Sequence, residues 1–243
     1  MRWALVALAC GQVGAALAIS GCSSSQEQSA KLERLAKLHA RTAPKGLVIT
    51  RPSREVTVLS STVVTSAEGT AVVVTLRNHS RRALRAIPLA LEVRDAAGAS
   101  VYTNSAPGLA HALTSVPLIA ARGELSWIDD QVQAAGGAPK SVHATAGEAP
   151  AATGPLPQIA VSGPHFTEGP EGSAAEGTVT NRSTTAQNEL VIFALAERAG
   201  RIVAAGRAVL SELAPGASAP FRAFLVGNAS GARLRIEAPP SST

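Results

Sequence analysis

The fold is decided by two stretches, VVVTLRNHS at residues 72–80 and GTVTNRS at residues 177–183. In each stretch, a run rich in β-branched residues ends at an Asn-x-Ser sequence. Such runs favour strands, and Asn and Ser side chains hydrogen-bond the local backbone in turns. An aliphatic run then follows in each half, IPLALEV at 87–93 and LVIFAL at 190–195. The chain therefore repeats one unit of strands and turns.

The remainder of each copy keeps the same order of elements. Gly98 and Gly200 stand where hairpins need a positive φ. An aromatic residue follows in each copy, Trp127 and then Phe221, and each is expected in a core. Short strands separated by Gly, Asn, Asp and Pro, with almost no helical periodicity, predict antiparallel β-sandwiches.

The predicted fold class is all-β, with two tandem antiparallel sandwiches. We place the first at residues 51–148 and the second at residues 158–243. Residues 149–157 are rich in Ala, Pro and Gly, as a linker between domains is.

The order of motifs resembles the FxLYD-type and related immunoglobulin-like modules of bacterial envelope proteins. The second copy carries the resemblance through Asn181, Gly200, Val203, Leu213, Pro215, Gly216 and Phe221. The first copy departs from it, because residues 121–123 (ARG) replace the Pro-Gly turn. The resemblance implies an immunoglobulin-like fold, with no enzyme activity and no fixed ligand.

The first 22 residues have the pattern of an export signal. Arg2 is followed by an apolar run that Gly and Gln interrupt, which suits a signal peptide at residues 1–21 better than a membrane span. Ile19-Ser20-Gly21-Cys22 resembles the lipobox of bacterial lipoproteins. The resemblance implies cleavage before Cys22 and a diacylglycerol thioether on that cysteine. The alternatives are an ordinary cleaved signal peptide and an uncleaved span.

Residues 22–50 are predicted to form a tether. Its polar start, SSSQEQ, is typical of a flexible segment, and residues 29–40 have the spacing of a short amphipathic helix or of a frayed linker. The expected location is membrane-anchored and exported, in the outer membrane if the organism has one and otherwise on the outer face of the cell membrane. Cations beside the anchor would be attracted to anionic headgroups.

Composition excludes several classes of function. The net charge is +5, but aromatic residues make up only 3%, and nucleic-acid sites usually combine a basic face with stacking aromatics. Nucleic acid is therefore not an expected partner. The two cysteines, Cys10 and Cys22, both lie within the leader and the lipobox, so no structural disulfide is expected.

Motifs of catalysis and cofactor binding are missing from the sequence. The five histidines do not have metal-ligand spacing, and there is no G-x-S-x-G elbow or phosphate-binding loop. We expect no enzyme activity, no cofactor and no metal.

The most distinctive polar feature of the sequence is the pair Asp129-Asp130, which lies close to Trp127. An aromatic face beside acidic groups suits the binding of a sugar or a cation, so these three residues form a candidate binding site. Adjacent strand residues point to opposite faces, however, and the favoured alternative is a solvated strand end after a core tryptophan. The predicted function is a non-catalytic binding or assembly module of the envelope, with a protein or polysaccharide partner. The alternative is a carbohydrate- or cation-binding accessory domain.

Overall fold

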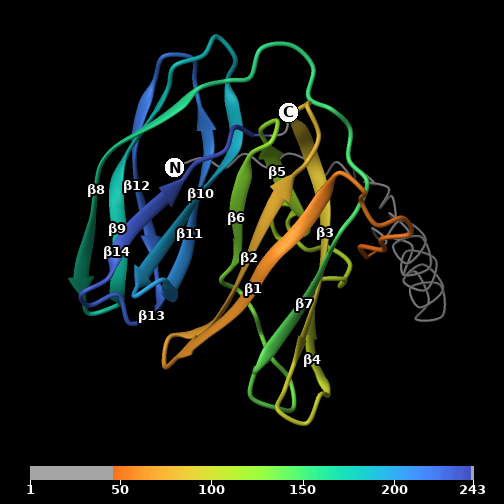
Figure 1. Ribbon diagram of the computed structural model, residues 1–243. Coiled ribbons are helices and arrows are strands. Elements are labelled where there is room, and N and C mark those ends of the chain that lie inside the picture. Colours follow the sequence, from red (N-terminus) through yellow and green to blue (C-terminus); the bar gives the residue numbers. More distant parts are fainter. Residues whose placement is uncertain (1–45, 242–243) are drawn as a thin grey trace, which may run out of the picture. The chain divides into compact units, whose positions relative to one another are not determined.

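The computed structural model describes residues 46–241, whose regular secondary structure is almost entirely β (Figure 1). The all-β prediction is confirmed, and the strand pairs are antiparallel. The first half contains β1 (Val56–Ser66), β2 (Gly69–Asn78), β3 (Leu84–Arg94), β4 (Ser100–Thr103), the short 3-10 turn η1 (His111–Leu113), β5 (Ser115–Ile119), β6 (Glu124–Asp129) and β7 (Ser141–Ala146). The second half contains β8 (Ile159–Gly169), β9 (Gly172–Asn181), β10 (Gln187–Arg198), β11 (Arg201–Leu213), β12 (Ser218–Phe224), β13 (Val226–Gly227) and β14 (Arg233–Glu237).

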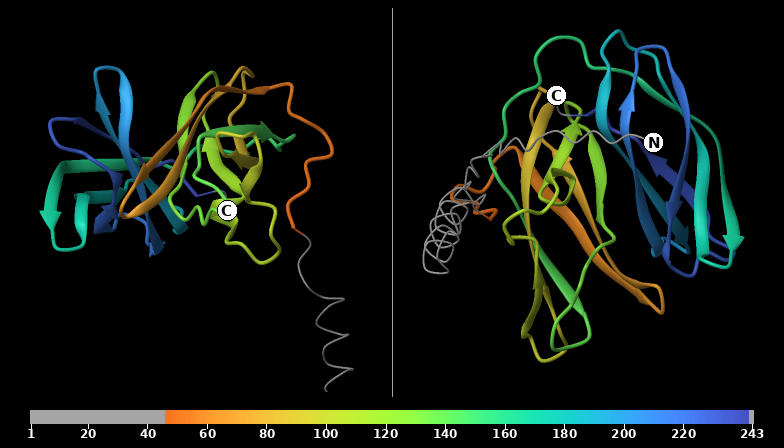
Figure 2. Two further views of the ribbon diagram at one scale, coloured as in Figure 1. Left: turned by 90° about the horizontal axis from the view of Figure 1, so that it is seen from below. Right: turned by 180° about the vertical axis from the view of Figure 1, so that it is seen from behind.

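The two halves share one pattern of strand pairing. In one sheet of each half, β2 lies between β1 and β6, and β9 lies between β8 and β12. In the other sheet, β3 pairs with β4, β5 and β7, while β10 pairs with β11 and β14. The long β11 thus occupies the place that β4 and β5 share in the first half. The repeat in the sequence is therefore a repeat in topology. Figure 2 shows the two halves from two further directions.

The Asn-x-Ser sequences build the same buried corner twice. The amide of Asn78 donates to the carbonyls of residues 82, 119 and 120, and its Oδ1 accepts the backbone N–H of Ser80. The amide of Asn181 donates to the carbonyls of residues 185, 213 and 214, and its Oδ1 accepts the backbone N–H of Ser183. Both asparagines are fully buried. Each one therefore ties a strand end to the turn that follows it and to one distant backbone segment, whose carbonyls need donors.

The two halves pack on each other through a common core. Residues 71–74 of β2 and residues 190–196 of β10 are buried without the alternation of a half-exposed strand. One apolar cluster joins Val72, Val74 and Trp127 of the first half to Phe193 and Leu195 of the second. Both strands read as continuous apolar runs because their sheets are covered on both faces. Residues 46–241 accordingly belong to one compact unit.

Polar side chains also join the two halves, by satisfying backbone groups. Glu237 accepts the backbone N–H of Ser126 on the edge strand β6, at 2.7 Å. The hydroxyl of Ser66 accepts the N–H of Gly227 at 3.2 Å. Pairing an open edge in this way removes a site where another strand could add.

The predicted linker, residues 149–157, begins along the first half. The carbonyl of Pro150 accepts the N–H of Arg85 at 3.1 Å, and Ala152 donates to the carbonyl of Ala83 at 2.8 Å. Ala151 forms an isolated bridge with Leu84. The start of this segment is therefore held against β3 by backbone hydrogen bonds.

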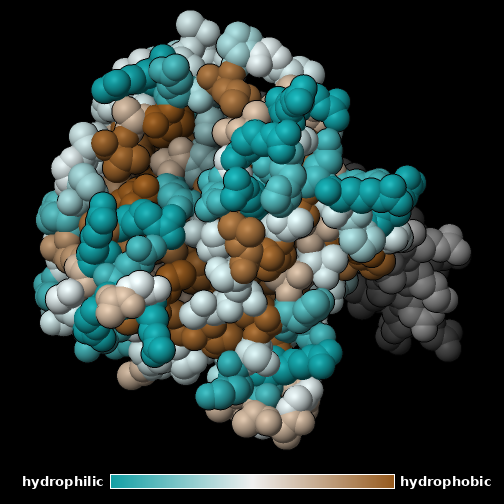
Figure 3. Space-filling view, in the orientation of Figure 1, coloured by the Kyte–Doolittle hydropathy of each residue, from teal (hydrophilic) through white to brown (hydrophobic). Residues whose placement is uncertain are grey.

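Apolar patches lie among polar side chains on the face shown in Figure 3. The large apolar side chains that are most exposed come from separate elements: Val48, Leu59, Leu156, Val209 and Phe224. Single exposed apolar side chains are ordinary on protein surfaces.

Candidate functional site

Cys22, the predicted lipidation site, lies outside the described residues, as do the signal peptide and most of the tether. Within residues 46–241, no helix has the length and apolar character that crossing a membrane requires.

Trp127 lies in the core of the first half. Its side chain is completely buried, and its indole Nε1 donates to the carbonyl oxygens of Ser115 at 3.0 Å and Ala112 at 3.2 Å. These carbonyls belong to the segment around η1, which has no counterpart in the second half. The prediction of a core tryptophan is confirmed, and its ring offers no exposed face for stacking on a sugar.

Asp129 is a buried carboxylate with two partners. It accepts the hydroxyl of Tyr102 at 2.7 Å and the backbone N–H of Gln131 at 2.9 Å. Burial raises the pKa of Asp129, and the two hydrogen bonds oppose this shift. Burial, followed by the carboxylate of Asp129, likewise raises the pKa of Tyr102. The expectation of a solvated strand end is wrong for Asp129, because packing around β4 covers the end of β6.

Asp130 points to the other half. Its carboxylate accepts the backbone N–H of Arg207 at 3.0 Å and the Nε–H of the same residue at 2.9 Å. The side chain of Asp130 is 16% exposed and that of Arg207 is 5% exposed, so this ion pair is largely shielded from water. The adjacent carboxylates diverge, as strand geometry predicts, and each is engaged by a protein partner. Trp127, Asp129 and Asp130 are thus not gathered on one open surface.

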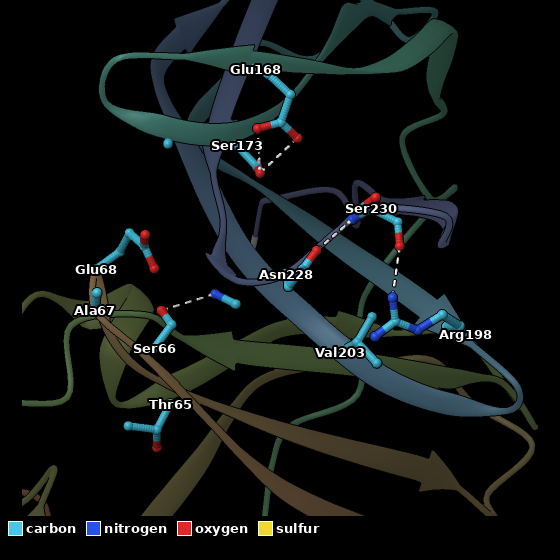
Figure 4. Close-up of a pocket in the computed structure, with 12 residues that line it drawn as sticks. Thr65, Ser66, Ala67, Glu68, Glu168, Ser173, Arg198, Val203, Asn228 and Ser230 are labelled. Atoms are coloured by element: carbon cyan, nitrogen blue, oxygen red, sulfur yellow. Dashed lines mark hydrogen bonds between the residues drawn. The ribbon is translucent and has the colours of Figure 1, made fainter.

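A polar groove of about 820 Å³ lies where hairpin tips of the two halves meet (Figure 4). The first half contributes the tip between β1 and β2, and the second half contributes its β8–β9 hairpin, the end of β10, part of β11 and the loop after β13. The lining residues are Thr65, Ser66, Ala67, Glu68, Glu168, Gly172, Ser173, Arg198, Val203, Gly227, Asn228 and Ser230. Its volume falls in the range of roughly 300–1,000 Å³ that is typical of small-molecule sites.

Three charged side chains give the groove its electrostatic character. Glu168 accepts the hydroxyl of Ser173 through its two oxygens, at 2.8 and 2.9 Å. A hydrogen bond from Ser66 is the main cause of a lowered pKa for Glu68, which therefore stays ionised near neutral pH. Arg198 donates from Nη1 to the carbonyl oxygen of Ser230 at 2.8 Å. Among the described residues, none of these three charges forms an ion pair.

The meeting of the two halves at the groove depends on Gly227. Its backbone N–H donates to the Ser66 hydroxyl, and its φ is +112°. A Cβ at this position would lie 2.3 Å from the carbonyl oxygen of Val203 and 2.8 Å from Val64. A side chain here would therefore separate β13 from its neighbours and disturb the groove.

Sequence reasoning did not find this groove. Its lining residues come from separate turns that lie far apart in the sequence. The sole local signal is that carboxylates and serines stand beside hairpin turns. No group of three or more His, Cys, Asp or Glu side chains in the described part of the chain is placed to hold a metal ion.

Comparisons with known proteins do not assign the chain to a family. No protein-family model matches it. No curated protein sequence matches it either. Among solved structures, it is similar to the exo-chitosanase CsxA of Amycolatopsis orientalis, alone and in complexes with PNP-beta-D-glucosamine, at 14% identity and a TM-score of 0.26. The match covers 73% of this chain and 25% of the chitosanase. A likeness this small says nothing about function.

Proposed function

We propose that this chain is a non-catalytic, lipid-anchored protein of the cell envelope that acts as a binding or assembly module. Its two halves are interpreted as tandem immunoglobulin-like modules. Lipid on Cys22 would hold the protein to the outer membrane, or to the outer face of the cell membrane where no outer membrane exists. Its partner is then an envelope protein or polysaccharide that reaches the groove.

The groove between the hairpin tips is the observation that carries this proposal. It is lined by both halves, and the hydrogen bond from Gly227 to Ser66 crosses between them beside it. A preformed concave site reduces the ordering cost of binding. Loops held on a β-framework are also a common location for binding residues.

The alternative function, carbohydrate or cation binding through Trp127, Asp129 and Asp130, receives less support. A ligand would have to reach a completely buried ring and displace the hydrogen bonds from Tyr102 and Arg207. Leaving such buried groups without partners costs about 1–3 kcal/mol for each hydrogen bond. The groove needs no such rearrangement.

The membrane part of the proposal is tested by fractionation. Cys22→Ala, or treatment of cells with globomycin, should release the protein from membranes or leave the uncleaved precursor. Unchanged processing and membrane attachment would contradict the lipid anchor.

The binding part is tested by photo-crosslinking in intact cells. A photo-reactive amino acid at Ala67, an exposed groove residue, should give a crosslinked product with an envelope component. Ala97 is the matched control, because it is an exposed alanine in the turn between β3 and β4, away from the groove. The same products from both positions would show that the groove is not the binding site.

A further inference from the structure

We propose that the groove recognises a short peptide carrying both a free ammonium group and a free carboxylate. This inference rests on the proposed function, because it takes the groove as the binding site and adds the chemistry of its ligand.

One side of the groove is a place for a cation. Glu68 and Glu168 are exposed carboxylates that come from different halves of the chain. A carboxylate has about four acceptor positions, and the Ser173 hydroxyl supplies Glu168 with a single proton. Because neither glutamate has an ion-pair partner among residues 46–241, both are available to a ligand ammonium group.

The far side of the groove is a place for an anion. Figure 4 shows Arg198 across the groove from Glu68, next to Ser230 and Val203. One N–H of its guanidinium is used by the Ser230 carbonyl, which holds the side chain in place. A guanidinium has five N–H donors, so a ligand carboxylate can still be bound through two parallel hydrogen bonds.

The lining favours a peptide over a neutral glycan. Glycan sites commonly present an aromatic ring to a sugar face, whereas the residues that line this groove include no aromatic side chain. A neutral ligand would also remove water from three charges without giving them a counter-charge, which is unfavourable. A peptide with free ends supplies a counter-charge on each side.

Titration calorimetry with tetraalanine tests the proposal, using the full-length acylated protein in nonionic detergent. Tetraalanine should bind, and acetylating its amino end or amidating its carboxyl end should each weaken binding about tenfold or more. Binding should also weaken as salt is added, because exposed charges are screened.

Two substitutions connect each end of the peptide to its side of the groove. Glu168→Gln should reduce the advantage of a free amino group, since only Glu68 remains, and should keep the advantage of a free carboxylate. Arg198→Gln should remove the advantage of a free carboxylate and keep that of a free amino group. Glu171→Gln and Arg201→Gln are matched controls, because these exposed residues lie beside the same hairpins outside the groove lining. Both controls should bind tetraalanine like the unaltered protein.

The peptide proposal is overturned if tetraalanine does not bind at about 10 mM, if blocking its ends makes no difference, or if neutral cellotetraose binds in its place. These outcomes are distinguishable from failure of the proposed function. Groove crosslinks from Ala67 without tetraalanine binding would keep the binding module and reject the peptide ligand. Tetraalanine binding by a protein that is neither lipidated nor crosslinked in cells would keep the peptide ligand and reject the proposed envelope function.

Discussion

Asp130 of the first half and Arg207 of the second are joined twice, because the carboxylate accepts both the backbone N–H and the side-chain Nε–H of the arginine. Arg207 is almost completely buried, and its Nη1 has no hydrogen-bond partner among the described residues. Asp130 is thus the main group that compensates a buried charge between the halves, and it belongs to the pair that the sequence suggested for ligand binding.

Asp130→Ala should destabilise the protein strongly. Removing one member of a buried ion pair leaves the other uncompensated, which typically costs about 3–5 kcal/mol. The free energy of unfolding, measured with urea, should fall by about that amount. Glu124→Ala is the control, since the exposed pair of Glu124 and Arg77 should contribute about 0–1 kcal/mol. Equal effects of the two substitutions would contradict a buried role for Asp130.

The raised pKa of Asp129 predicts a specific dependence of stability on pH. The folded state holds the proton of Asp129 more tightly than the unfolded state does. The contribution of this residue to stability is therefore fully present below the pKa of about 3.8 that it has in the unfolded state. The contribution is lost as the pH rises through the pKa of the folded state. Asp129→Asn abolishes this titration. The stability of the variant, relative to that of the unaltered protein, should therefore increase as the pH rises from about 4. Unfolding curves of both proteins across this range would show a constant difference if the carboxylate were solvated.

A third Asn-x-Ser sequence begins at Asn228, and it should respond differently from those at Asn78 and Asn181 to loss of the asparagine. Asn78→Ala and Asn181→Ala each leave buried carbonyls without donors, at a cost of about 1–3 kcal/mol or more. Asn228 is exposed, and its Oδ1 only accepts the N–H of Ser230 in a turn, so Asn228→Ala should change stability by less than about 1 kcal/mol. Thermal unfolding of the three variants would refute the shared-corner interpretation if all of them shifted alike.

Gly206→Ala should separate two strands of the second half. A Cβ there would lie 1.8 Å from the carbonyl oxygen of Phe224, so β12 would have to move away from β11. Overpacking of this kind typically costs about 1–3 kcal/mol, and a backbone clash lies at the upper end. Gly169→Ala is the control, because its Cβ would meet only a flexible arginine side chain at 3.6 Å. Chemical denaturation should show little change for the control.

Much of the local architecture was predictable from the residues. The β-branched runs and the Asn-x-Ser turns recur in both halves, and strand ends and hairpins follow from such short-range preferences. The structure adds that Ala86 and Glu189, at the same distance from Asn78 and Asn181, both have positive φ. Alanine and glutamate do not favour positive φ, so the sequence does not predict this conformation. Tertiary packing imposes it.

The candidate site was not predictable in the same way. Trp127 was correctly expected in the core, because a large aromatic residue within an apolar strand is usually buried. The partners of Asp129 and Asp130 could not be inferred, since Asp130 and Arg207 are 77 residues apart. The groove was missed for the same reason, as Glu68 and Glu168 come together only when the halves pack.

The sequence by itself determined the class of fold, the internal repeat and the turns, because these depend on side-chain shape and hydrogen bonding within a few residues. Only the tertiary structure decided that β2 and β10 are covered on both faces and that the two halves form one unit. Contact between two sheet faces depends on the complementary shape and charge of residues that are far apart along the chain. That contact places the acid of Asp130 against Arg207 and opens the groove at the hairpin tips.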